Sequence, residues 1–122
     1  MYELSVQSEF AAAHFLRDYH GKCENLHGHN WRVEVRLRAE ELDKTGMVMD
    51  FKEVRGLVSQ VIEEFDHKCL NELEQFARLN PTTENVCRLL YEKVGSKLPA
   101  GIGVSRVTCW ESDRCAASYQ ES

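Results

Sequence analysis

The strongest constraint on the fold is a strict alternation of apolar and polar residues over residues 31–39. Apolar residues occupy every odd position from Trp31 to Ala39, and all the even positions are charged. Successive side chains of a β-strand point to opposite faces of a sheet, so this period of two predicts a strand with one buried face. Residues 2–14 alternate in a similar way, which predicts a second half-buried strand.

The period changes to that of a helix from Asp50 onward. Apolar residues recur at helical spacing, and Asp50 and Glu53 occupy the N-cap and N3 positions of a capping box. A helix is therefore predicted over about 50–65. A second helix is predicted to start near Pro81, whose fixed φ suits a first turn, and to stop before Pro99.

The remaining segments complete the predicted architecture. We expect a short strand at 46–49, and strands near 103–112 and 114–120. Runs of like elements favour an α+β fold with an antiparallel sheet and helices on one face. A chain of 122 residues suits one domain, so we expect residues 1–122 to form a single domain.

Charge and hydropathy narrow the classes of partner. The net charge is -5 with acids and bases interspersed, so the chain lacks the broad basic field typical of nucleic-acid binding. The N-terminus has no signal-peptide pattern, and no run approaches the ~20 apolar residues of a membrane span. We therefore expect a cytoplasmic protein without a nucleic-acid or membrane partner.

The cysteines do not form a disulfide framework, because there are five of them and no CxxC pair. Cys69, Cys87, Cys109 and Cys115 lie in or beside apolar sequence, and we predict that all four are small buried hydrophobes. Cys23 stands apart in the stretch CENLHGHN, residues 23–30, where a thiol precedes two histidines separated by one glycine.

Parity suggests that this stretch meets a third histidine. His14 shares the parity of the apolar face of the first strand, and His27 and His29 share that of the second. If the two strands pair in antiparallel fashion, their connecting ends are neighbours. The three imidazoles would then converge on one face, unless a bulge at residues 11–13 changes the count.

Three histidines with an open fourth position are typical of a catalytic zinc site. Two histidines spaced as HxH also occur as ordinary surface or hydrogen-bonding residues, so the residues alone leave both interpretations open. A zinc finger usually needs two cysteines, and Cys23 has none nearer than Cys69. The Cys23 thiol would either close the site as a fourth ligand or act beside the metal as an activated thiol.

Other acidic and histidine residues carry weaker signals. Asp66 and His67 lie at the exit of the first predicted helix, where they would form a proton-transfer pair or solvate the helix end. Glu111 is either a functional residue or a solvated strand carboxylate. The stretch NPTTEN, residues 80–85, is also explained as a helix start.

Taken together, these motifs resemble the family of the 6-pyruvoyl- and 6-carboxytetrahydropterin synthases. The resemblance covers nearly the whole chain, and the order and spacing of the motifs are highly specific. It rests on FAAAH (10–14), CENLHGHN (23–30), MDF (49–51), Asp66–His67, NPTTEN (80–85) and Trp110–Glu111.

The resemblance implies a tunnelling fold (T-fold), a small α+β domain in which the sheets of several subunits join into a barrel. It implies a homo-oligomer with active sites at subunit interfaces, Zn²⁺ as cofactor and 7,8-dihydroneopterin triphosphate as substrate. By matching positions, His14, His27 and His29 would bind zinc. Cys23 would be the general base, and Asp66 and His67 the proton relay, contributed by the same or a neighbouring subunit.

The same resemblance assigns the substrate contacts. Glu111 would take part in catalysis by anchoring the pterin ring, and Thr82, Thr83 and Glu84 match a segment near the pterin pocket. Arg17 and Lys22 are candidates for meeting the triphosphate, although no glycine-rich phosphate loop accompanies them.

The three residues between Cys23 and His27 look like the carboxy-forming branch of the family, since the pyruvoyl-forming branch typically has a longer gap. The resemblance thus implies a zinc-dependent lyase of queuosine biosynthesis that makes 6-carboxytetrahydropterin, acetaldehyde and triphosphate. The alternatives are a 6-pyruvoyltetrahydropterin synthase, which eliminates triphosphate, and a non-catalytic three-histidine metal-binding module.

Overall fold

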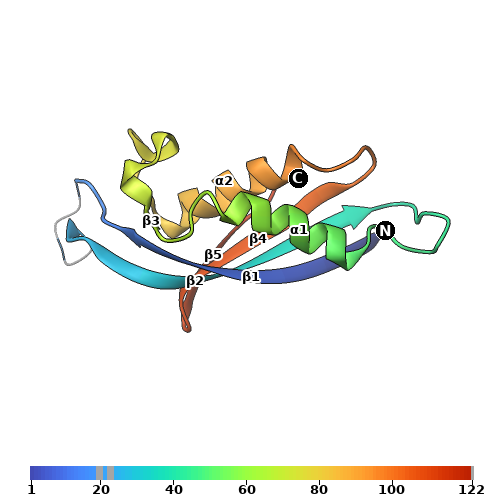
Figure 1. The fold of residues 1–122 in the computed structure, drawn as a ribbon, viewed down its shortest axis with the longest axis horizontal. Coiled ribbons are helices and arrows are strands. Elements are labelled where there is room, and N and C mark those ends of the chain that lie inside the picture. Colours follow the sequence, from blue (N-terminus) through green and yellow to red (C-terminus); the bar gives the residue numbers. More distant parts are fainter. Residues whose placement is uncertain (19–20, 22–23, 122) are drawn as a thin grey trace.

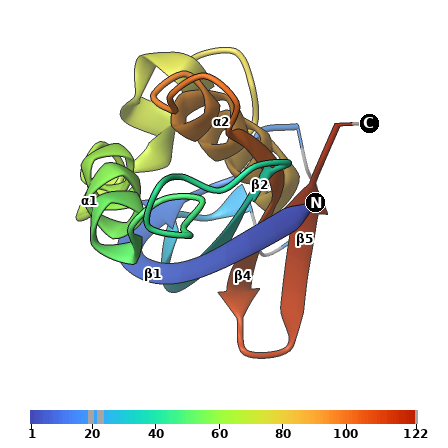
Figure 2. The same cartoon turned by 90° about the vertical axis from the view of Figure 1, so that its right-hand side faces the viewer.

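The protein forms one curved sheet with two helices on the same face, as the computed structural model shows in two views (Figures 1 and 2). The structure describes residues 1–18, 21 and 24–121. The five strands lie in the order β3-β1-β2-β4-β5. The elements are β1 (Tyr2–His14), β2 (His27–Ala39), α1 (Phe51–Ile62), β3 (Lys68–Cys69), two 3₁₀ turns (Leu70–Glu72 and Glu74–Phe76), α2 (Thr83–Gly95), β4 (Gly103–Ser112) and β5 (Cys115–Tyr119).

The central strands pair as the alternation predicts. β1 and β2 are antiparallel, and their register runs without interruption from Tyr2 opposite Ala39 to His14 opposite His27. No bulge occurs at residues 11–13, and β2 begins at His27, four residues earlier than the predicted strand. The apolar face of this pair forms the core, where the rings of Phe10 and Trp31 stack with centroids 5.7 Å apart.

The helices cover this face, and side-chain caps fix where each begins. The Asp50 carboxylate accepts a hydrogen bond from the backbone N–H of Lys52 at 2.8 Å, and α1 starts at the next residue, Phe51. The Thr82 hydroxyl accepts from the backbone N–H of Asn85 at 3.1 Å, and α2 starts at Thr83. The first helix ends at Ile62, three residues before its predicted end.

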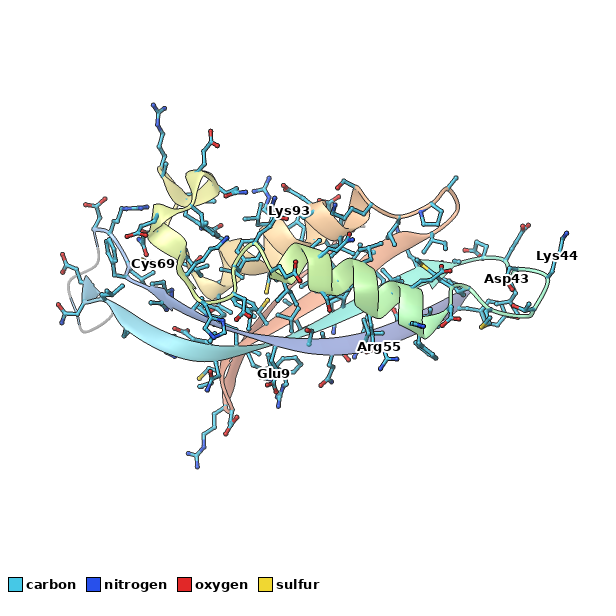
Figure 3. The ribbon with its side chains drawn as sticks, viewed as in Figure 1. Glu9, Asp43, Lys44, Arg55, Cys69 and Lys93 are labelled. Atoms are coloured by element: carbon cyan, nitrogen blue, oxygen red, sulfur yellow. The ribbon has the colours of Figure 1, made fainter. Side chains whose placement is uncertain are left out.

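Two predictions about strands were wrong. The segment 46–49 is not a strand, because the Asp43 carboxylate accepts from the backbone N–H groups of Thr45 and Met47, and Gly46 has φ +85°. These bonds form a compact turn, which lies at the far end of the sheet from Cys69 (Figure 3). The sheet is also not wholly antiparallel, since β3 pairs with β1 in parallel. Two residues are too short to show a periodicity.

The four cysteines that the structure describes are of three kinds, buried, half-buried and exposed, so the prediction that all four are buried was partly wrong. Cys87 on α2 and Cys109 on β4 are fully buried, as expected. Cys69 is only half-buried, and Cys115 is exposed at the start of β5. Cys115 follows the β4–β5 turn on the edge strand of the sheet, where its apolar neighbours in sequence are also largely exposed.

Candidate metal centre and active site

Three histidines meet on the helix-covered face at one end of the β1–β2 pair. His14 ends β1 and lies opposite His27, while His29 lies opposite Ala12. The centroids of the three rings are 4.6, 5.2 and 4.7 Å apart. Because residues paired across a ladder share a face, the strand register alone brings these imidazoles together.

Glu111 on β4 completes the cluster. Its Oε1 lies 3.1 Å from His14 Nε2 and 2.9 Å from His29 Nε2, and its Oε2 accepts a hydrogen bond of 3.1 Å from the Thr83 hydroxyl. One ligand atom from each of the four residues lies within 4.8 Å of the others. No pattern in the sequence predicts that Glu111 lies beside the histidines. One signal could have indicated the face of the sheet on which it lies: Glu111 has the same parity as Cys109, whose side chain lies on the core face of β4.

Backbone carbonyls orient two of the imidazoles. His14, only 2% exposed, places Nδ1 2.8 Å from the carbonyl oxygen of Pro81. His27 Nδ1 lies 2.7 Å from the carbonyl oxygen of Asn25. A carbonyl can only accept, so each Nδ1 carries a proton. A neutral imidazole then has its lone pair on Nε2, the form that a metal would bind, and His14 Nε2 faces Glu111 Oε1 at 3.1 Å.

The third imidazole is held by position rather than by a directed bond. His29 Nε2 is buried and lies close to Glu111, yet it makes no well-aligned hydrogen bond within the described residues. Burial lowers the pKa of His29, and the neighbouring His14 and His27 rings lower it further, while Glu111 opposes them. Metal ligation requires a neutral imidazole. The three nitrogen donors fit zinc or a similar borderline divalent ion, and the Glu111 carboxylate lies beside the position of a fourth ligand.

Asp66 and His67 form a separate pair at the outer edge of β1. His67 Nδ1 lies 3.0 Å from Asp66 Oδ1, which also accepts from the backbone N–H of Ala11 at 2.9 Å. That N–H lowers the pKa of Asp66. The His67 side chain is 82% exposed and has φ +60°. Asp66 is therefore tied to β1 rather than solvating a helix end, and it orients an imidazole that faces solvent.

A hollow of about 540 Å³ lies beside this pair, and it is lined by His67, Lys68 and Cys69 together with residues 11–13 and 28–30. Ala11 and Ala13 alternate with the buried Ala12 and His14, so their side chains face away from the histidine cluster. Glu9, of the same parity, also projects from the face opposite the helices (Figure 3). No hydrogen bond or ion pair within the described residues joins His67 to the cluster.

The other predicted site residues have distinct environments. Thr82 caps α2, Thr83 is buried against Glu111, and Glu84 is exposed in the first turn of α2. Arg17 is engaged, because its guanidinium donates to the carbonyl oxygens of Leu79 and Asn71 at 3.2 and 3.3 Å. The predicted base Cys23 and the phosphate candidate Lys22 lie outside the described residues.

Comparison with known families agrees with this geometry. The family model described as 6-pyruvoyl tetrahydropterin synthase matches residues 3–122. The chain belongs to this family. A solved structure of the family, the 6-pyruvoyl tetrahydropterin synthase of Caenorhabditis elegans, superposes with a TM-score of 0.88 at 31% identity, covering 99% of this chain and 96% of that one. The prediction of the subunit fold of this family is thus confirmed.

Curated members of the family carry more than one activity. A putative 6-carboxy-5,6,7,8-tetrahydropterin synthase from Archaeoglobus fulgidus is 36% identical over 90% of this chain and 88% of its own length. A dihydroneopterin monophosphate aldolase from Pyrococcus furiosus is 35% identical over 88% of this chain and 87% of its own length. Within the described residues, no helix is both long and apolar enough to cross a membrane.

Proposed function

We propose that this chain is a zinc-dependent 6-carboxytetrahydropterin synthase of queuosine biosynthesis. The observation that carries the proposal is the cluster of His14, His27, His29 and Glu111 at the end of the β1–β2 pair. The three-residue gap between Cys23 and His27 favours the carboxy-forming branch, and so does the similarity to the Archaeoglobus fulgidus relative.

The proposed reaction consumes 7,8-dihydroneopterin triphosphate and one water. The bond between the first and second side-chain carbons breaks, water oxygen adds to the first carbon, and triphosphate leaves the third. The products are 6-carboxy-5,6,7,8-tetrahydropterin, acetaldehyde and triphosphate. The first two carbons are oxidised while the pterin ring and the third carbon are reduced by the same number of electrons. No external oxidant is needed.

Each proposed site residue has a role that its chemistry suits. Glu111 accepts hydrogen bonds from the amino and ring N–H groups of the pterin, and Thr83 holds its second oxygen in place. Cys23 removes a proton from the side chain, and His67, oriented by Asp66, carries a proton to or from a side-chain oxygen. Zinc held by the three histidines would act as a Lewis acid on the side-chain oxygens.

We further propose that Asp66 and His67 serve the site of a neighbouring subunit. Within one chain His67 is 82% exposed and makes no bond to the cluster in the described residues. The sheet also offers two edges for assembly. β1 meets β3 only at Ala12 and Ala13, so among the described residues its outer edge from Tyr2 to Phe10 is unpaired, and β5 forms the opposite edge. Joining one edge to the other, subunit after subunit, closes a barrel.

Incubation of the zinc-loaded protein with dihydroneopterin triphosphate tests the proposed activity. Mass spectrometry should identify 6-carboxytetrahydropterin, and a coupled assay should detect acetaldehyde in equal amount. A 6-pyruvoyl product would assign the chain to the pyruvoyl-forming branch instead. Absence of turnover with retained zinc would support the metal-binding module.

The Pyrococcus furiosus relative supports a second candidate, an aldolase acting on dihydroneopterin monophosphate. The same assay with the monophosphate separates the two. Cleavage of the monophosphate at a higher kcat/KM than that of the triphosphate would favour the aldolase.

Subunit exchange tests the shared relay. Cys23→Ala and His67→Ala should each be inactive, but mixed oligomers should recover up to about a quarter of the sites, because each working site takes one intact group from each variant. Verified mixed oligomers without activity would place the relay within one chain.

A further inference from the structure

His14 is the most deeply buried of the three histidines, and its orientation depends on one carbonyl. Its Nδ1–H donates to the Pro81 carbonyl oxygen at 2.8 Å, which leaves Nε2 directed at the cluster. The equivalent bond of His27 goes to Asn25, two residues before it in the chain, and so forms locally. Pro81 lies 67 residues from His14 along the sequence. Some other contact must hold it in register.

Asn80 supplies that contact, because its side chain pairs with both polar backbone groups of one residue. Its Oδ1 accepts from the backbone N–H of Arg17 at 2.8 Å, and its Nδ2 donates to the carbonyl oxygen of Arg17 at 2.9 Å. The carbonyl of Asn80 itself accepts from Asn85 Nδ2 at 2.9 Å. Asn80, the residue immediately before Pro81, thus ties the start of α2 to the segment that follows β1.

Asn71 makes the same pair of hydrogen bonds to the backbone of a different residue in this segment, Phe15. Its Oδ1 accepts from the backbone N–H of Phe15, and its Nδ2 donates to the carbonyl oxygen of Phe15, both at 2.9 Å. It therefore anchors the same segment beyond β1. Asn71 thus holds the backbone directly after His14, whereas Asn80 is itself the residue directly before Pro81, whose carbonyl orients the His14 ring.

We infer that Asn80 is a positioning residue of the metal centre, which acts by holding the Pro81 carbonyl against His14 Nδ1. Proline fixes its own φ, so the direction of the Pro81 carbonyl depends on how the residues beside it are held. Outer partners that orient a ligating histidine typically change metal affinity by about 10–100-fold when they are lost. The inference rests on the proposed metal centre.

Metal titration of four proteins tests the inference without measuring turnover. Zinc affinity, obtained by competition with a chelator, should fall about 10–100-fold in Asn80→Ala, and the absorption bands of bound Co²⁺ should shift because His14 is misoriented. Asp43→Ala, which loses three hydrogen bonds in the turn at the far end of the sheet, should also lose thermal stability but keep affinity within about threefold of wild type. Asn80→Asp retains one of the two Arg17 bonds and should be intermediate, which keeps the test usable if Asn80→Ala does not fold.

The outcomes separate the inference from the proposed function. Wild-type protein that binds no zinc would overturn the proposed metal centre and the inference with it. If wild type binds zinc, equal affinity and an unchanged Co²⁺ spectrum in both Asn80 variants would overturn the inference alone. An equal loss of affinity in the Asp43 and Asn80 variants would also overturn it, because the loss would then follow overall stability rather than the orientation of His14.

Discussion

The two halves of the β1–β2 pair share one uninterrupted register, but one carries apolar side chains on the core face and the other carries histidines. In one half, residues 2–10 paired with 31–39, Phe10 stacks on Trp31 and packs against Phe65 from the segment after α1. The Trp31 ring lies at the border of this half, edge-on to His14 and His29 with centroids 5.1 and 5.8 Å away. In the other half, the same face carries His14 and His29. The alternation of the strands positions both sets of side chains, so the difference lies in what covers them.

The two halves should differ in the substitutions that they tolerate. The apolar half needs volume to be filled, and several combinations of side chains do that. The histidine half needs particular atoms, namely the Pro81 carbonyl oxygen at His14, the Asn25 carbonyl oxygen at His27 and the Glu111 carboxylate between His14 and His29. Substitutions in the first half should therefore change stability, and those in the second should change metal binding.

The largest expected effect lies in the apolar half. Phe65→Ala removes a fully buried ring that packs against Phe10 with centroids 5.9 Å apart, and should cost about 3–5 kcal/mol of unfolding free energy. Zinc binding should fall only as folding is lost. Urea denaturation monitored by circular dichroism measures the change. A loss below about 1 kcal/mol would show that this half is not the main source of stability.

The second prediction concerns the histidine half. His29→Ala should lose most bound zinc while the metal-free protein changes little in stability, because this ring, 24% exposed, is not part of the apolar core. Elemental analysis and thermal unfolding with and without chelator measure both quantities. Cys23→Ala is the control and should retain zinc. Full occupancy in His29→Ala would remove it from the ligand set, and equal loss in the control would favour a closed site.

Much of this contrast could be predicted from the sequence. Parity alone placed His14, His27 and His29 on the core face, because the period of a strand is strict and no bulge interrupts β1. The helices followed from their spacing and caps. The register of the pair also depended on little more than the apolar pattern and a connection between adjacent strands.

The missed features depend on contacts between distant segments. The parallel pairing of β3 with β1 and the hold of Asn80 on Arg17 join parts of the chain that no local pattern relates. The position of Glu111 beside His14 also needed the order of the strands, which places β4 next to β2. Topology, rather than local propensity, fixed these features.

A smaller effect is expected when the carboxylate at the centre is altered. Glu111→Gln keeps the shape and the contact with Thr83 but removes the negative charge, so kcat/KM for the pterin substrate should fall about 10–100-fold with zinc content unchanged. Steady-state kinetics and elemental analysis on the same sample check this. Loss of zinc as large as in His29→Ala would make Glu111 a fourth ligand rather than a pterin anchor.

The smallest expected effect concerns the side chains that cap the two helices. Asp50→Ala and Thr82→Ala each remove one side-chain bond to a helix N–H, and each should cost about 1 kcal/mol of unfolding free energy. Asp50 caps α1, whereas Thr82 lies between Pro81, which orients His14, and Thr83, which holds Glu111. Only Thr82→Ala should therefore also lower turnover, by a few-fold at most. Denaturation and kinetics measured on both variants decide the matter. Equal turnover at equal loss of stability would mean that the start of α2 holds the site no more closely than the start of α1 does.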